Sequence, residues 1–133
     1  MEETHDAGWW LRAAERDEAV VQRLMKVGFH GGAGEHLAQA AQKYLRAVLA
    51  QQGRRSRAKS CVELLEEVAE ETPVPEELTS ATKALDNPPR KKKLKSLDDI
   101  PRRLEDEDAI ESLAKQLEVV KSFALKGLGQ GPP

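Results

Sequence analysis

The sequence predicts an all-α protein, an up-and-down antiparallel bundle of four to five helices. Apolar residues recur at three- and four-residue spacings in successive segments, which is the pattern of amphipathic helices. Aromatic residues are few, with two Trp, two Phe and one Tyr among 133 residues. The core must therefore be built mainly from Leu, Val and Ala, which suits closely packed helices better than a strand-rich sandwich.

The first two predicted helices form an antiparallel pair. The first spans about residues 6–27 and ends at Gly28, and the second spans about 33–52, with Gly53 favouring the left-handed turn that follows. The apolar stripe of the first helix comprises Trp10, Ala14, Val20, Val21, Leu24 and Met25. That of the second comprises Leu37, Ala40, Ala41, Tyr44, Leu45, Val48 and Leu49. The glycine-rich segment 29–34 between them is expected to be a tight turn, and binding of an anion by its backbone amides is the alternative.

Three shorter patterns follow. Ser60 and Glu63 have the spacing of a capping box and begin a third helix, which Pro73 and Pro75 end. A fourth helix then reaches about Leu85. The last helix begins near residues 105–108, and its stripe comprises Ile110, Leu113, Ala114, Leu117, Val120 and Phe123. We expect a single domain over residues 1–126, with 86–105 as a basic and mobile connection and 127–133 as a flexible tail.

The overall charge gives no basic footprint, because 21 Lys and Arg are balanced by 23 Asp and Glu. Contact with nucleic acid would therefore need a local patch. Two segments are candidates for phosphate contacts, comprising Arg54, Arg55, Arg57 and Lys59, and Arg90, Lys91, Lys92, Lys93 and Lys95. The second segment has an alternative interpretation as a solvated loop that docks on the acidic outer face of the third helix.

Several classes of protein do not fit the sequence. The single cysteine, Cys61, cannot form an internal disulfide, and no Cys and His spacing matches a metal site, so we expect neither metal nor cofactor. The first residues lack the basic start and apolar run of a secretory signal. No segment approaches the roughly 20 apolar residues of a membrane span. We therefore expect a soluble, cytoplasmic protein.

Two segments resemble the HEPN family of small helical domains. They are the Trp-Leu-Arg opening at residues 10–12 and the His-Leu-Ala-Gln-Ala-Ala-Gln-Lys run at residues 36–43. The resemblance implies a helical bundle that forms a homodimer, and several family members pair with small nucleotidyltransferases in toxin–antitoxin modules. For this chain we assign the dimer interface to Trp9, His36, Ala40, Lys43 and Tyr44. Trp9 is included because two adjacent tryptophans cannot face the same core from one helix.

Other HEPN proteins are metal-independent ribonucleases, in which an arginine is followed by a polar residue and then, after a short interval, by a histidine. Where many relatives have that histidine, this chain reads Arg57-Ala58-Lys59-Ser60, and lysine does not titrate near neutral pH. Arg23 and His30 match the spacing, but Leu24 follows the arginine. These two residues and His36 are therefore weak catalytic candidates.

The resemblance favours a binding or regulatory module that is the partner of a small nucleotidyltransferase and contacts nucleotide or RNA through its basic residues. Two alternatives stay open. One is an active ribonuclease toxin, and the other is a purely structural dimer whose partner carries out the chemistry.

Overall fold

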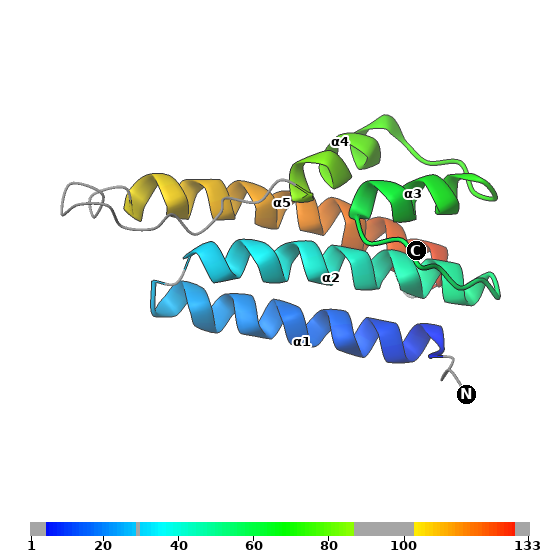
Figure 1. The fold of residues 1–133 in the computed structure, drawn as a ribbon, viewed down its shortest axis with the longest axis horizontal. Helices are drawn as coiled ribbons and strands as arrows, with labels where there is room; N and C mark the ends of the chain where they lie inside the picture. The colour runs from blue at the N-terminus through cyan, green and yellow to red at the C-terminus, as the bar shows by residue number, and fades with distance from the viewer. Residues whose placement is uncertain (1–4, 29, 87–102, 130–133) are drawn as a thin grey trace.

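A computed structural model of the chain describes residues 5–28, 30–86 and 103–129, without the side chains of residues 30, 31 and 103–107. The described residues form five helices and no strand, as the sequence predicts (Figure 1). Their bounds are α1 Ala7–Lys26, α2 His30–Gln51, α3 Cys61–Ala69, α4 Glu76–Leu85 and α5 Arg103–Gly127. No helix in this part of the chain has both the length and the apolar character needed to cross a lipid bilayer.

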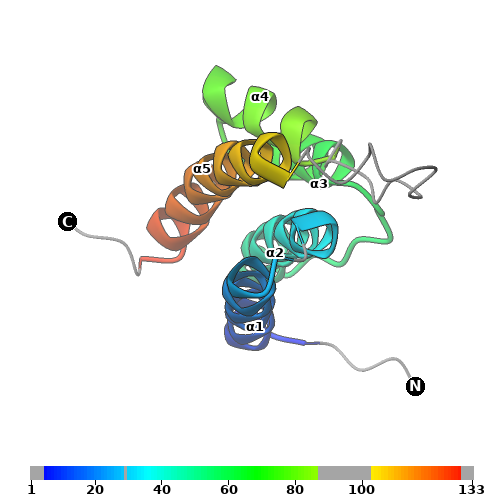
Figure 2. The ribbon, with the colours of Figure 1, turned by 90° about the vertical axis from the view of Figure 1, so that its left-hand side faces the viewer.

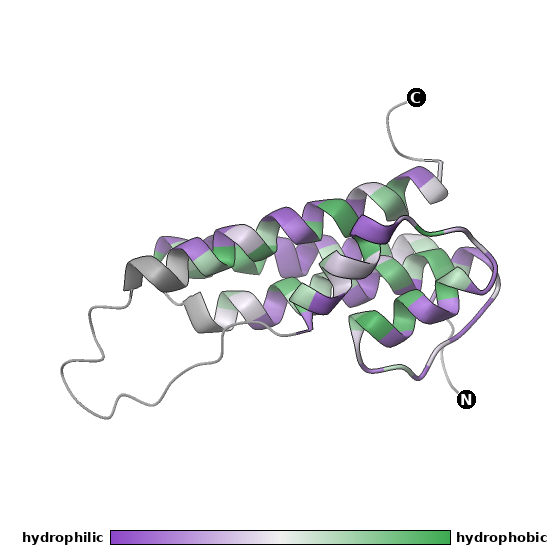
Figure 3. Ribbon diagram, turned by 90° about the horizontal axis from the view of Figure 1, so that it is seen from above, coloured by the Kyte–Doolittle hydropathy of each residue, from purple (hydrophilic) through white to green (hydrophobic). Residues whose placement is uncertain are grey.

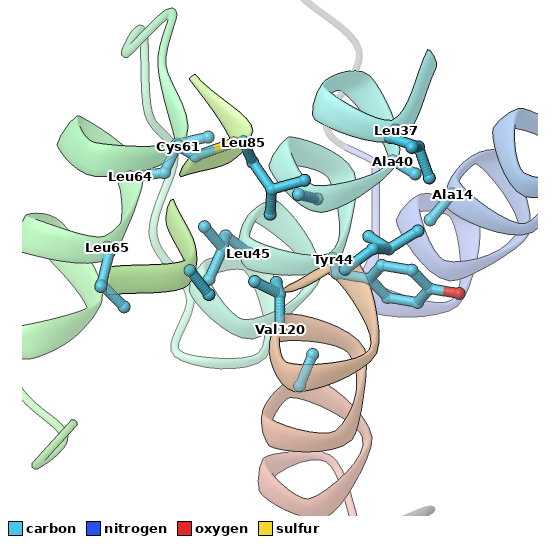
Figure 4. Packing of buried hydrophobic residues seen from close by; sticks show 14 of the residues in the cluster. Ala14, Leu37, Ala40, Tyr44, Leu45, Cys61, Leu64, Leu65, Leu85 and Val120 are labelled. Atoms are coloured by element: carbon cyan, nitrogen blue, oxygen red, sulfur yellow. The ribbon is translucent and has the colours of Figure 1, made fainter. Parts of the chain in front are cut away.

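The central helix of the bundle is α2. It packs against α1 on one side and against α3 and α5 on the other, while α4 lies over α3 and α5 (Figure 2). Alanines let α1 and α2 lie close together, because Ala14 of α1 lies opposite Leu37 and Ala40 of α2 (Figure 4). Ala14 and Ala40 are both completely buried. The alanine content of the second predicted helix thus has a structural explanation within a single chain.

The core lies between α2 and the three later helices. Leu45, Leu64, Leu85 and Val120 meet there, one from each of four helices (Figure 4), and each is completely buried. Hydrophobic and hydrophilic residues alternate along the helices rather than forming continuous apolar runs (Figure 3). This alternation is the three- and four-residue periodicity from which the helices are predicted.

The start of α2 differs from the prediction. The sequence predicts a turn over residues 29–34, yet α2 already begins at His30, so Gly31, Gly32 and Gly34 lie inside the helix. A side chain at Gly32 would begin 3.4 Å from the Cδ1 atom of Leu24 in α1. This is an ordinary contact distance, so the first turn of α2 lies against the last turn of α1, and this packing outweighs the low helix propensity of glycine.

The ends of the helices mostly follow the predicted signals. Gly28 and Gly53 have φ angles of 83° and 72°. After α2, the amide of Gly53 donates to the Ala50 carbonyl oxygen at 2.9 Å and that of Arg54 donates to Leu49 at 2.8 Å. These two bonds form a Schellman motif.

The N-terminus of α3 has two caps. Ser60 Oγ accepts a hydrogen bond from the amide of Glu63 at 3.1 Å, as the capping-box spacing predicts. Asp86, at the end of α4, accepts from the amides of Cys61 at 2.7 Å and Val62 at 2.9 Å. A carboxylate at a helix N-terminus is stabilised by the helix dipole, so Asp86 fastens α4 to the start of α3.

Candidate functional site

The connection between α2 and α3 runs as an extended segment with alternating side chains. The side chains of Arg55, Arg57 and Lys59 are exposed, whereas those of Arg54, Ser56 and Ala58 are partly buried. Alternate residues of an extended chain point to opposite sides. Three of the four basic residues predicted on this segment therefore lie in a row on its outer side.

Arg46 of α2 holds this extended segment in place. Its guanidinium donates from Nη1 to the carbonyl oxygen of Ser56 at 2.8 Å and from Nη2 to that of Ala58 at 2.5 Å. The same guanidinium lies 5.5 Å from the ring centroid of Trp10 in α1, within the range of a cation–π contact. Arg46 thus joins α1, α2 and the connection.

Arg54, the inward-facing residue of the basic group, has a different role from its three neighbours. Its guanidinium donates to the Glu67 carbonyl oxygen at 2.6 Å and pairs with the Glu70 carboxylate at 2.5 Å. Both partners belong to the end of α3, and the Glu67 carboxylate also accepts a hydrogen bond from the Ser56 hydroxyl. The connection is therefore fastened to α3, and two acidic residues on the outer face of that helix take part.

A cleft of about 800 Å³ lies between the start of α1 and the end of α2. It is lined by His5, Asp6, Trp10, Arg46, Leu49, Ala50, Gly53, Arg54, Arg55 and Ser56. The cleft therefore combines aromatic, apolar and cationic surface. The sequence predicts Arg54 and Arg55 as binding residues, but it does not single out His5, Trp10 or Arg46.

A second polar cluster lies halfway along the α1–α2 pair. Asp17 of α1 is only 6% exposed, and its carboxylate contacts Nδ1 of His36 at 3.0 Å and Nζ of Lys43 at 2.5 Å. An ionised carboxylate only accepts hydrogen bonds, so the His36 ring donates from Nδ1. The side chains of His36 and Lys43 are 33% and 29% exposed, so both reach solvent while Asp17 does not.

A third contact links α1, α2 and α5. The Tyr44 hydroxyl points out of the core on the side of α1 (Figure 4) and donates to Glu18, and Glu18 also pairs with Lys121 of α5 at 3.3 Å. Burial raises the pKa of Tyr44 above its ordinary value, and the hydrogen bond to Glu18 and the nearby carboxylates raise it further. Tyr44 therefore remains a neutral donor at physiological pH.

Two of the three weak catalytic candidates have side chains in the described part of the chain. Arg23 is exposed near the end of α1, and His36 is bonded to Asp17. His30 begins α2, but its side chain lies outside the described residues, so the Arg23–His30 pair stays a prediction. No arginine contacts His36 among the described residues.

The five residues assigned to the dimer interface differ in exposure. Ala40 and Tyr44 are buried by the chain's own helices, so neither needs a second copy for its burial. Trp9 is 38% exposed and stacks on His5 with a centroid separation of 3.5 Å. The interface stays a prediction, and its exposed candidates are Trp9, His36 and Lys43.

Other predictions fall outside what the structure describes. The basic run of Arg90, Lys91, Lys92, Lys93 and Lys95 lies within residues 87–102, which are not among the described residues. Within the described ranges, no group of three or more His, Cys, Asp or Glu side chains is arranged to hold a metal ion.

Comparisons with known proteins agree with this fold. A family model described as the HEPN domain matches residues 7–126. An HEPN domain protein from Thermotoga maritima, TM0613, is 26% identical with a TM-score of 0.78, covering 91% of this chain and 98% of its own. TT1696 from Thermus thermophilus is 28% identical with a TM-score of 0.66, covering 86% of this chain and 95% of its own. No curated protein matches significantly. Because the family model covers most of its length, the chain belongs to the HEPN domain family.

Proposed function

We propose that this HEPN protein is a binding or regulatory module that contacts the phosphates of RNA through the α2–α3 connection and acts with a small nucleotidyltransferase. The observation that carries the RNA contact is the exposed row of Arg55, Arg57 and Lys59. Extended backbone rises about 3.3 Å per residue, so alternate side chains are spaced by roughly 6.5 Å. A regular row of cations at this spacing suits the repeating charges of a polynucleotide backbone.

The segment that presents this row is held firmly. The bonds from Arg46 to Ser56 and Ala58 fix its inner edge, and Arg54 fixes its start on α3. A rigid support reduces the conformational entropy that the cations lose on binding. Among the described residues, neither Arg57 nor Lys59 forms an ion pair that would compete with phosphate.

The described geometry favours binding over ribonuclease chemistry. Cleavage through the 2′-hydroxyl requires a proton-transferring group beside a cation that stabilises the phosphate. The row contains arginine and lysine but no histidine, and His36 is bonded to Asp17 on a different part of the α1–α2 pair. His5 lines the same cleft as Arg55, but its ring is stacked on Trp9. RNA binding without cleavage in the presence of a chelator is therefore the proposed outcome for the purified protein.

The salt dependence of RNA binding tests the row directly. Each phosphate contact to a single strand contributes about 0.7 to the slope of log affinity against log salt concentration. We expect the double variant Arg57→Gln, Lys59→Gln to reduce the magnitude of this slope by about 1.4, measured by fluorescence anisotropy with labelled single-stranded RNA.

A matched control is Arg16→Gln with Lys26→Gln, which removes the same charge from exposed positions on α1. This control should leave the slope nearly unchanged. Equal effects of the two double variants would show that only total charge matters, and the assignment of the row would then be wrong. Cleavage that persists in chelator would instead favour the ribonuclease alternative.

The nucleotidyltransferase partnership is supported by family membership, since several HEPN proteins form such pairs. Co-expression with a nucleotidyltransferase encoded beside this gene is expected to give a complex with a defined stoichiometry by size-exclusion chromatography with light scattering. Trp9→Ala should weaken the complex if the interface uses this exposed side chain. Val27→Ala is the matched control, because it removes another exposed apolar side chain. Separate elution of the two proteins would contradict this part of the proposal.

A further inference from the structure

We infer that His36 is a phosphoryl-acceptor site, at which the Nε2 atom takes a phosphoryl group from a donor with an activated phosphorus–nitrogen bond. The observation behind this inference is the polar cluster that Asp17, His36 and Lys43 form on the α1–α2 pair. The site goes beyond the proposed RNA contact, because it uses none of the residues of the exposed row.

Asp17 fixes the proton of the His36 imidazole on one nitrogen. Its carboxylate belongs to a residue that is only 6% exposed, and it accepts a hydrogen bond from Nδ1 of His36 at 3.0 Å. In a neutral imidazole, a proton on Nδ1 leaves the lone pair on Nε2. A carboxylate in this position also stabilises the imidazolium that forms when Nε2 bonds to an electrophile. The pair therefore makes Nε2 the nucleophilic nitrogen.

The Nε2 atom of His36 is accessible to solvent. It has no hydrogen-bond partner among the described residues, and in that part of the chain no buried side-chain nitrogen or oxygen lacks a partner. The unpartnered Nε2 is therefore not buried, in agreement with the 33% exposure of the side chain. Helical side chains lean toward the N-terminus, so His36 lies over the turn that contains Gly32, which has no side chain to cover the ring.

Lys43 supplies a positive charge beside the ring. Its Nζ atom contacts the second oxygen of the Asp17 carboxylate at 2.5 Å. His36 and Lys43 thus share one carboxylate, which places the ammonium group next to the imidazole. The Lys43 side chain is 29% exposed, and an ammonium group has three donor hydrogens. It can therefore donate to a phosphoryl oxygen while it stays paired with Asp17.

Phosphoryl transfer to this nitrogen needs no additional base. With phosphoramidate protonated on its nitrogen, the Nε2 lone pair forms a bond to phosphorus, the phosphorus–nitrogen bond of the donor breaks, and ammonia leaves with that electron pair. The product is an imidazolium that carries the phosphoryl group on Nε2 and keeps its original proton on Nδ1. Asp17 balances the charge of the ring and Lys43 that of the phosphoryl oxygens, so groups already in place stabilise both charges.

The position of the cluster favours a phosphoryl acceptor over a general base. A general base needs a site that holds its substrate within hydrogen-bond reach. His36 is not among the residues that line the cleft of about 800 Å³ between the start of α1 and the end of α2. An acceptor on an open helix face needs only an accessible nucleophile, because the donor group is brought to it by another molecule.

Reaction of the whole chain with potassium phosphoramidate tests the inference. The chain contains three histidines, His5, His30 and His36, and peptide mapping by mass spectrometry at alkaline pH locates the acid-labile phosphoryl group among them. We expect His36 to react at least fivefold faster than N-acetylhistidine, a fully exposed reference compound. In the variant His5→Gln, His30→Gln, where His36 is the sole histidine, phosphorus NMR should show the Nε2 isomer alone.

Two variants probe the groups that position the imidazole. Asp17→Asn removes the charge at nearly constant shape and is expected to slow the reaction at least tenfold and to give a mixture of Nδ1 and Nε2 isomers, which loss of packing alone would not produce. The matched control Glu111→Gln removes an exposed carboxylate and should change the rate less than twofold. If circular dichroism shows that Asp17→Asn does not fold, Lys43→Gln decides the question, with an expected slowing of at least fivefold and the Nε2 isomer retained.

The inference is overturned if His36 reacts no faster than N-acetylhistidine, if the phosphoryl group enters at Nδ1, or if another histidine carries most of it. It is also overturned if neither Asp17→Asn nor Lys43→Gln slows the reaction. RNA binding by the exposed row is a separate result, because Arg57→Gln, Lys59→Gln should be phosphorylated at the rate of the parent. Loss of RNA binding in that variant therefore bears on the proposed function alone.

Discussion

Replacement of Asp17 with alanine is expected to lower the free energy of unfolding by about 2–3 kcal/mol. The carboxylate is nearly buried and contacts both His36 and Lys43, so its loss leaves these two partly buried side chains without their shared acceptor. Removing one partner of a fully buried ion pair costs about 3–5 kcal/mol. The expected value is smaller here because His36 and Lys43 reach solvent. For a chain of this size, the melting temperature should fall by roughly 6–12 °C, measured by thermal unfolding.

The matched control is Glu111→Ala, which removes an exposed carboxylate from α5. Exposed charges contribute about 0–1 kcal/mol, so this variant should unfold close to the parent temperature. A double-mutant cycle with Asp17→Ala and Lys43→Met then measures the coupling between the pair. Equal melting temperatures for Asp17→Ala and Glu111→Ala would show that the buried cluster does not stabilise the α1–α2 pair.

Asp17 also shows why some of the structure could not be predicted from the sequence. The helices and their ends could be predicted, because periodic apolar residues, Ser60 and Gly53 give local signals that depend on few neighbours. In an amphipathic pattern, however, a charged residue is assigned to the solvent face. Asp17 is buried because His36 and Lys43, 19 and 26 residues away, compensate its charge. That pairing depends on the register between α1 and α2, which the sequence pattern does not specify.

The candidate cleft could not be predicted from the sequence for a related reason. The basic residues of the α2–α3 connection could be identified from composition, but their separation into inward and outward sets follows from the extended backbone. In the sequence pattern, Arg46 is one of several polar residues on the outer faces of its helix. Its partners are carbonyl oxygens of Ser56 and Ala58, which leave no trace in residue types. The proximity of Trp10 to Arg46 likewise depends on how α1 packs against α2.

The protein is expected to lose stability in mildly alkaline solution because of Cys61. The thiol is completely buried, and burial raises its pKa well above its ordinary value, with a further contribution from the Asp86 carboxylate. In the unfolded chain the thiol ionises above about pH 8.5. From that pH upward the folded state binds more protons than the unfolded state, so stability falls as pH rises, by about 1.4 kcal/mol per pH unit for one group. The expected loss between pH 8.5 and 10 is about 2 kcal/mol, measured by urea unfolding at a series of pH values.

The variant Cys61→Ala isolates this contribution, because alanine does not titrate. Its stability at pH 7 should be lower than that of the parent, because a smaller side chain leaves a cavity. The comparison therefore uses the slope of the unfolding free energy against pH rather than its absolute value. Tyr44, whose pKa is also raised by burial, should add to the slope only above about pH 10, where an unfolded tyrosine begins to ionise. Tyr44→Phe should therefore match the slope of the parent between pH 8.5 and 10 and diverge from it at higher pH. The range from pH 8.5 to 10 lies below the ordinary pKa of tyrosine and lysine, so the thiol should dominate the slope there. If Cys61→Ala has the same slope as the parent in this range, the thiol is not the group responsible.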